Sequence, residues 1–305
     1  MISKGQNIFL SVRITHSRWL LSMLCLFLVV TTAAAQEPGS SQGEAHYASL
    51  EGKRVYYKSY GKGREALVLV HCWSCNMDHW RDQIPDFSKK SRVIALDLPG
   101  HGQSDKPEVA YTMDLFARAV DAVLRDAGVE RGVLVGHSIG TPVIRQFYRK
   151  YPQKTLALVI VDGALRPFGD KKIADSMLAS LRAPNYKEAG AQMFSAMEGP
   201  QISPEIQERI KNSFLNTPQH VLVSAMEGMM DDSIWGQDKI NVPVLAVMAK
   251  SPYWPADLEQ AYRSIAPKLD FQMWDGVGHF LMMEKPKQFN EVVLTFLDKN
   301  ALLKK

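Results

Sequence analysis

Six short and nearly continuous apolar runs constrain the fold of this chain more than any other feature. Runs of this length without polar alternation are typical of parallel strands that are buried on both faces. Helical patterns separate the runs, so the sequence predicts an α/β fold with a doubly wound, mostly parallel sheet. The runs cover residues 66–70, 92–96, 132–135, 156–161, 242–248 and 270–274.

Residues outside these runs predict further elements of the same fold. An edge hairpin is expected over residues 47–60. A helix is expected from Thr112 to Ala127, because threonine is a good amino-terminal cap and apolar side chains follow at helical spacing. Further helices are expected over residues 143–151 and 289–297.

Residues 165–235 interrupt the alternation of strands and helices. They contain helical patterns and no strong strand, which predicts a helical cap inserted into a core made of residues 46–164 and 236–305. Methionine suits an adaptable apolar pocket wall, although each methionine can equally pack a cap helix onto the core. Six methionines are concentrated in this segment: Met177, Met193, Met197, Met226, Met229 and Met230.

The amino-terminal segment has the pattern of a secretory signal. Three basic residues and no acidic residue accompany an apolar run over residues 20–30, and a run of alanines ends at Ala35. We therefore expect residues 1–35 to be cleaved after Ala35 and the protein to be periplasmic or extracellular. An uncleaved anchoring helix is the alternative. Residues 36–45 are expected to form a solvated linker.

Signal cleavage also changes the charge balance. It would remove three of the 36 lysines and arginines and none of the 32 acidic residues, so the net charge would fall from +4 to about +1. No basic patch indicates a nucleic-acid partner. No stable membrane span is expected after cleavage.

Cleavage would leave only two cysteines, Cys72 and Cys75, because Cys25 lies in the signal segment. We expect both to be reduced and to pack within their loop. A disulfide is an alternative, since an export compartment permits one. Zinc bound together with His71 and His79 is a further alternative, but ligands crowded into nine residues would distort the loop. We expect no metal and no cofactor.

The sequence Gly136-His137-Ser138-Ile139-Gly140 reads G-x-S-x-G between an apolar strand and a helical run. A sharp turn from strand to helix holds its corner residue in a strained backbone conformation and exposes the serine oxygen. This context predicts that Ser138 is a nucleophile.

With this motif, three other segments resemble the α/β-hydrolase family over residues 46–164 and 236–305. His71-Cys72-Trp73 stands where the family usually has His-Gly-x, and residues 97–104 resemble its D-x-x-G-x-G-x-S loop. The sequence from Gly276 to Phe280 resembles the loop that delivers the catalytic histidine. The resemblance implies His279 as the general base.

The identity of the triad acid stays open in the sequence. The family usually supplies the acid after the strand that matches residues 242–248, but no carboxylate follows there until Asp257. The family also uses an acid after the preceding strand, where Asp162 stands. We prefer Asp162, with Asp257 and Asp275 as alternatives.

Two backbone N–H groups are expected to bind the oxyanion of an acyl-transfer intermediate. The resemblance implies Ile139, directly after the nucleophile, and Trp73 in the loop after the first core strand. Cys72 departs from the glycine that the family usually has beside this loop position, which puts the geometry of the Trp73 donor in question.

The sequence thus favours a secreted serine hydrolase that cleaves an ester or related acyl bond of a small, apolar substrate. Lactonase or aminopeptidase activity is an alternative within the fold. A small-molecule receptor with low turnover is an alternative from another class, and lyase or cofactor-free redox chemistry is a third. Ser138 argues against the dehalogenase and epoxide-hydrolase branches, whose nucleophile is a carboxylate.

Overall fold

The computed structural model describes residues 43–167, 171–200 and 202–303. The expected signal segment lies outside these residues, as does most of the expected linker. The linker prediction is wrong at its end, because residues 44 and 45 are paired with Ser59 and Lys58 in an edge strand. In the described part of the chain, no helix is both long and apolar enough to cross a membrane.

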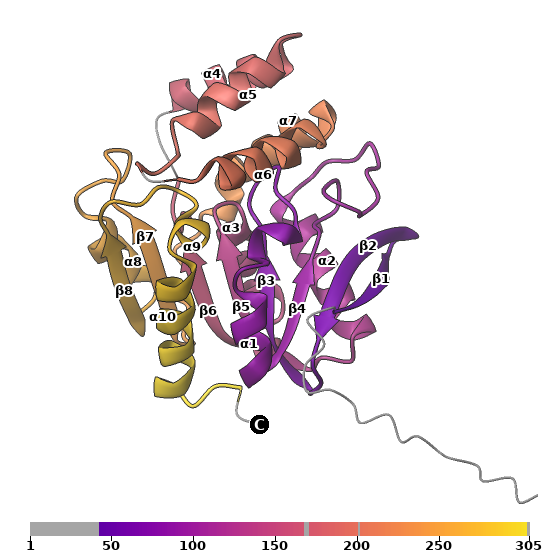
Figure 1. Ribbon diagram of the computed structural model, residues 1–305, viewed down its shortest axis with the longest axis vertical. Helices are drawn as coiled ribbons and strands as arrows, with labels where there is room; N and C mark the ends of the chain where they lie inside the picture. Colours follow the sequence, from indigo (N-terminus) through magenta and orange to yellow (C-terminus); the bar gives the residue numbers. More distant parts are fainter. Residues whose placement is uncertain (1–42, 168–170, 201, 304–305) are drawn as a thin grey trace, which may run out of the picture. The chain divides into compact units, whose positions relative to one another are not determined.

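An eight-stranded sheet forms the core, in the order β1-β2-β4-β3-β5-β6-β7-β8 (Figure 1). Strands β3 to β8 are parallel, and β2 joins both β1 and β4 in antiparallel pairs. The predicted doubly wound, mostly parallel sheet is confirmed. The strands are β1 (Glu44–Leu50), β2 (Lys53–Tyr60), β3 (Glu65–Val70), β4 (Arg92–Leu96), β5 (Arg131–His137), β6 (Thr155–Val161), β7 (Val244–Ala249) and β8 (Leu269–Trp274).

The predicted strands agree with the structure apart from small shifts at their ends. The hairpin turns at Glu51 and Gly52, whose φ angles of 51° and 76° suit a tight two-residue connection. Strand β7 begins only at Val244, because Pro243 before it has no N–H to donate to a neighbouring strand.

Figure 1 shows α1 and α10 in front of the sheet, with α2, α3 and α8 behind it. The Thr112 side chain caps α2 by accepting a hydrogen bond of 3.1 Å from Leu115 N–H, as predicted. The core helices are α1 (Ile84–Lys90), α2 (Met113–Asp126), α3 (Gly140–Lys150), α8 (Leu258–Ile265), α9 (Leu281–Glu284) and α10 (Pro286–Lys299). Short 3₁₀ helices are η1 (Met77–Trp80), η2 (Pro152–Lys154) and η3 (Asp232–Ile234).

Among the described residues of the segment where the cap is expected, four α-helices lie over the carboxyl ends of the parallel strands (Figure 1). The indole Nε1 of Trp73 donates a hydrogen bond of 2.9 Å to the carbonyl of Leu222 in the cap. The backbone N–H of His279 donates one of 2.8 Å to Met197 O. The cap helices are α4 (Lys171–Arg182), α5 (Tyr186–Ser195), α6 (Pro204–Leu215) and α7 (Gln219–Met229).

Candidate active site

Ser138 stands at the corner between β5 and α3 in a backbone conformation that non-glycine residues rarely adopt. Its φ is +56°, and its side chain is half-buried. Hydrogen bonds fix the corner: Ser138 N–H donates to Val161 O at 3.0 Å, and Thr141 N–H donates to Ser138 O at 2.9 Å. A Cβ at Gly140 would lie 2.6 Å from Val70 O, so only glycine fits there. The turn therefore has the strained geometry that the sequence motif predicts.

The His279 imidazole contacts the Asp162 carboxylate. Nδ1 of His279 lies 2.6 Å from Oδ2 of Asp162, and the Asp162 side chain is almost fully buried. The other carboxylate oxygen accepts hydrogen bonds from Ala249 N–H at 2.9 Å and from the indole Nε1 of Trp254 at 3.2 Å. Asp162 thus bonds to the end of β7, to the loop that follows β7 and to Nδ1 of His279. Nε2 of the imidazole is left for other partners.

The two alternative acids form other ion pairs. Asp257 pairs with Arg166 at 2.8 Å, and Asp275 pairs with Lys250 at 3.0 Å. Both carboxylates are exposed, and their pairing lowers the pKa of each. Of the three acids weighed from the sequence, the structure brings only Asp162 to His279.

The loop that carries His279 is held by partners that the sequence analysis did not identify. His137 donates from Nε2 to His279 O at 2.8 Å. Burial keeps the pKa of His137 well below its usual range, so its ring is neutral. Glu284 accepts a hydrogen bond of 3.0 Å from Gly278 N–H. Trp254 and Glu284 belong to no motif, so no sequence signal pointed to them.

The two candidate oxyanion donors follow neighbouring strands in equivalent positions. Val70 of β3 pairs with Gly136 of β5, and Trp73 and Ile139 each lie three residues further along. Both residues are buried. Neither backbone N–H has a hydrogen-bond acceptor among the described residues. Two unpaired N–H groups at one sheet edge are the donors that an oxyanion requires.

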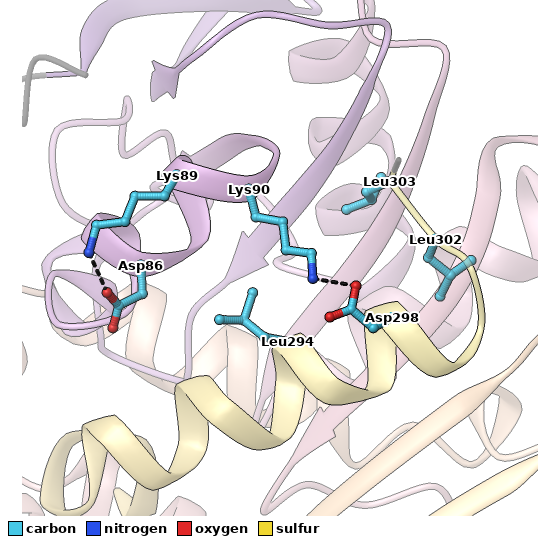
Figure 2. Close-up of a pocket in the computed structure, with 7 residues that line it drawn as sticks. All are labelled: Asp86, Lys89, Lys90, Leu294, Asp298, Leu302 and Leu303. Atoms are coloured by element: carbon cyan, nitrogen blue, oxygen red, sulfur yellow. Dashed lines mark hydrogen bonds and ion pairs between the residues drawn. The ribbon is translucent and has the colours of Figure 1, made fainter. Parts of the chain in front are cut away.

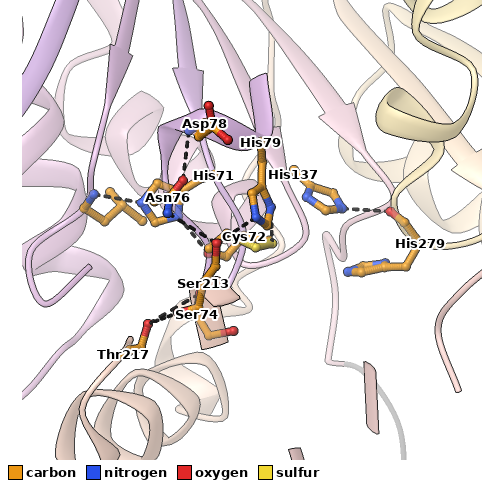
Figure 3. The surroundings of a disulfide bond; sticks show 12 residues. His71, Cys72, Ser74, Asn76, Asp78, His79, His137, Ser213, Thr217 and His279 are labelled. Atoms are coloured by element: carbon orange, nitrogen blue, oxygen red, sulfur yellow. Dashed lines mark hydrogen bonds between the residues drawn. A yellow bond between two sulfur atoms is a disulfide. The ribbon is translucent and has the colours of Figure 1, made fainter. Parts of the chain in front are cut away.

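The prediction of reduced cysteines is wrong, because Cys72 and Cys75 form a disulfide (Figure 3). The turn between them brings their Cα atoms to 5.1 Å, within the range that a disulfide spans. His79 lies close enough to complete a metal-ligating group with the two sulfur atoms. Sulfurs bonded to each other are not thiolates, however, and metal binding needs thiolates.

Aromatic rings fill the space between the Trp73 loop and the cap. The centroid of the Trp73 ring lies 5.8 Å from that of Phe194 and 6.0 Å from that of Phe214, both in the cap. Phe194 also lies 6.2 Å from Phe280, which follows His279. Of the cap methionines, Met226 is buried, and Met177, Met193, Met229 and Met230 are partly buried against the core. The cap therefore places aromatic rings beside the loop that carries Trp73.

A separate surface hollow of about 700 Å³ lies between α1 and α10 (Figure 2). The ion pairs Lys89–Asp86 and Lys90–Asp298 line it. Lys90 precedes β4 at its amino end, whereas Ser138 follows β5 at its carboxyl end, so the hollow lies at the opposite edge of the sheet from Ser138.

Comparisons with known proteins agree with this architecture. The family described as alpha/beta hydrolase fold matches residues 65–192. A dihydrolipoyllysine-residue acetyltransferase component of an acetoin cleaving system from Cupriavidus necator is 32% identical over 144 residues, which are 45% of this chain. That match spans only 38% of the relative's length.

Two further relatives align over most of their length. A 2-hydroxy-6-oxononadienedioate/2-hydroxy-6-oxononatrienedioate hydrolase from Paraburkholderia phymatum is 25% identical over 80% of this chain and 91% of its own. The solved structure of an N-acyl homoserine lactone degrading enzyme is 28% identical, covers 82% of this chain and 100% of its own, and superposes with a TM-score of 0.73. On its fold and its relatives, this chain is an enzyme with the α/β-hydrolase fold.

Proposed function

We propose that this protein is a serine hydrolase that cleaves an ester or related acyl bond of a small, apolar substrate. Ser138 is the nucleophile, His279 the general base and Asp162 the triad acid. The 2.6 Å contact between Asp162 and His279 Nδ1 is the observation that carries the proposal. A carboxylate at Nδ1 selects the tautomer whose Nε2 accepts a proton from the serine, and it stabilises the imidazolium that forms.

The reaction follows from these roles. Ser138 Oγ attacks the acyl carbon while His279 Nε2 takes its proton. The negative oxygen of the tetrahedral intermediate accepts hydrogen bonds from the N–H groups of Trp73 and Ile139. His279 then protonates the leaving group, and an acyl-enzyme on Ser138 results. Water, activated by the same imidazole, releases the acid and restores the serine.

The aromatic cap favours an apolar acyl or alcohol group. The rings of Phe194 and Phe214 pack against the Trp73 ring. A cyclic ester is the second candidate substrate, since the lactone-degrading relative is 28% identical over 82% of this chain. The two substrate classes share the same chemistry at Ser138.

A panel of aryl esters, alkyl esters and lactones with purified mature protein tests the proposal. Turnover of at least one class by the wild type, with none by Ser138→Ala, is expected. If a ligand only raises the melting temperature and no compound is turned over, the protein is instead a receptor on the same fold.

Export is a separate part of the proposal and rests on the sequence pattern of residues 1–35. The mature protein is expected to begin at or near Gln36 in the periplasm or medium. Sequencing of its amino terminus after expression with the native leader tests this. Protein that still begins at Met1 in the cytosol would contradict it.

A further inference from the structure

The Cys72–Cys75 disulfide encloses Trp73, one of the two candidate oxyanion donors. We propose that this disulfide is a positioning element that holds the Trp73 N–H in the direction needed to bind an oxyanion. The inference rests on the proposed function and adds a role for a covalent link that the reaction itself does not use.

The first argument is the geometry of a single peptide plane. The C=O of Cys72 and the N–H of Trp73 belong to the same planar peptide and point in opposite directions. Cys72 O accepts two hydrogen bonds, from Cys75 N–H at 3.1 Å and from His71 Nδ1 at 2.8 Å. Fixing this carbonyl therefore fixes the direction of the Trp73 N–H.

The second argument is the state of His71 (Figure 3). Its Nε2 accepts a hydrogen bond of 2.9 Å from Leu98 N–H, so Nδ1 carries the proton that goes to Cys72 O. Burial keeps the pKa of His71 well below its usual range, so the ring stays neutral and this arrangement persists. His71 thus anchors the carbonyl to β3 and to the loop after β4. On the other side of the turn, Thr217 Oγ1 donates a long hydrogen bond of 3.4 Å to Ser74 O, and the disulfide is the covalent hold.

The third argument is Ser74. Its φ is +57°, a conformation that non-glycine residues keep only when their surroundings hold them in it. Its buried Oγ has no hydrogen-bond partner among the described residues, so its side chain does not stabilise the turn. The link between Cys72 and Cys75 spans Ser74 and limits the conformations that the turn can relax into. Without that link, we expect the peptide planes on either side of Ser74 to rotate.

The contacts of the Trp73 side chain do not fix the direction of the Trp73 N–H. Its indole bonds to Leu222 O and stacks on Phe194, which anchors the ring to the cap but leaves the peptide plane free to turn. This anchor is useful for testing, because it keeps the loop in place when the disulfide is absent. Both cysteines are only 2% exposed, so the disulfide is poorly placed to exchange with a thiol of another protein.

The test is a double variant, Cys72→Ala with Cys75→Ala, compared with the wild type. Removing one oxyanion donor typically costs about 10²- to 10³-fold in kcat, so a misdirected donor should cost about 10- to 100-fold. KM for an ester should change less than about threefold, since the ground-state carbonyl needs this donor little. The affinity for a boronic acid, which mimics the tetrahedral intermediate on Ser138, should fall in proportion to kcat/KM.

Val293→Ala is the matched control. Val293 is a fully buried residue of α10, so the variant should lower the melting temperature without touching the loop. If it loses as much kcat as the double cysteine variant at equal destabilisation, the disulfide has only a general structural role and the inference is wrong. Unchanged kcat and unchanged boronic-acid affinity in the double variant would also overturn it.

Amide hydrogen exchange separates this inference from the proposed function. Exchange of the backbone N–H of residue 75, which donates to the carbonyl of residue 72, should be slow in the wild type and at least tenfold faster in the double variant, whatever the enzyme hydrolyses. A wild type without turnover or boronic-acid binding contradicts the proposed function, whereas unchanged exchange in the variant contradicts the disulfide's role.

Discussion

Asp162 and His279 are 117 residues apart in the sequence, yet Oδ2 of one lies 2.6 Å from Nδ1 of the other. Asp162 directly follows β6 and reaches the imidazole from there. The family usually supplies its acid after the next strand, which is β7 in this chain. The backbone of that next strand still takes part, since Ala249 N–H at the end of β7 donates to the second oxygen of Asp162.

Asp162→Asn should therefore lower kcat by up to about 10⁴-fold, because an amide at this position favours the unproductive tautomer of His279. Steady-state kinetics with the best ester measures the effect. Asp257→Asn and Asp275→Asn are the controls, since both carboxylates form surface pairs, and both should stay within about twofold of the wild type. Full activity in Asp162→Asn would show that Asp162 is not the triad acid.

Phe194 is expected to set the size of the group that the site accepts. Its ring lies between Trp73 and Phe280, so Phe194→Ala should open space beside the catalytic loops. We expect the ratio of kcat/KM for long over short acyl esters to rise roughly tenfold. Ile173→Ala, at a position that is 58% exposed on α4, should leave the ratio unchanged. A ratio that stays constant in Phe194→Ala would show that this ring does not line the acyl site.

Arg145 is expected to fasten the cap to the core. It is almost fully buried on α3 and donates to the carbonyls of Leu165 and Gly236, which lie at the two ends of the inserted segment. Burial lowers its pKa to about 10, so the guanidinium stays charged at neutral pH. Arg145→Met leaves both carbonyls without this donor and should lower the free energy of unfolding by about 2–4 kcal/mol.

Urea denaturation measures the Arg145 effect. Arg64→Met is its control, because Arg64 forms an exposed surface pair with Glu130 and should change stability by less than about 0.5 kcal/mol. An equal loss of unfolding free energy in the two variants would show that Arg145 does not fasten the cap to the core.

Stability should fall as the pH drops below about 6.5. Burial lowers the pKa of His101 to about 4 and that of His137 well below its usual range, so the unfolded chain binds protons that the folded chain rejects. The stability that these neutral rings contribute is complete above the unfolded pKa and is lost as the pH falls toward the folded value. Each of these two histidines should lower the free energy of unfolding by on the order of 1 kcal/mol as the pH falls from 6.5 to 5.5.

Urea denaturation between pH 7.5 and 5 checks this dependence. The variant His101→Gln should show a shallower decline than the wild type, because it lacks one of the titrating rings. An equal or steeper decline would assign the loss to other groups.

The sequence predicted the elements that depend on local pattern. The apolar runs, the Thr112 cap and the turn around Ser138 agree with the structure because each is determined by neighbouring residues. The contact between Asp162 and His279 was foreseen as a preference, from the absence of a carboxylate in the loop after β7. Whether Ser138, His279 and Asp162 act as a triad stays a prediction.

Other features depend on contacts that no local pattern encodes. The disulfide was only an alternative in the sequence, because cysteines three residues apart can pair or pack, and no local pattern showed the positive φ of Ser74 between them. Trp254 reaches Asp162, and Glu284 reaches Gly278, only once the loops after β7 and β8 are folded. The contacts of the cap rings Phe194 and Phe214 with Trp73 were not predicted either, since the sequence analysis considered the methionines of the cap.

The central claim is that Ser138 is the nucleophile, and covalent labelling tests it most directly. Mature protein treated with a fluorophosphonate should gain one adduct by intact mass, and peptide mapping should find it on Ser138. Inhibition should rise in step with labelling, and Ser138→Ala should show neither label nor turnover. A label on another residue, or ester turnover that survives in Ser138→Ala, would contradict the account.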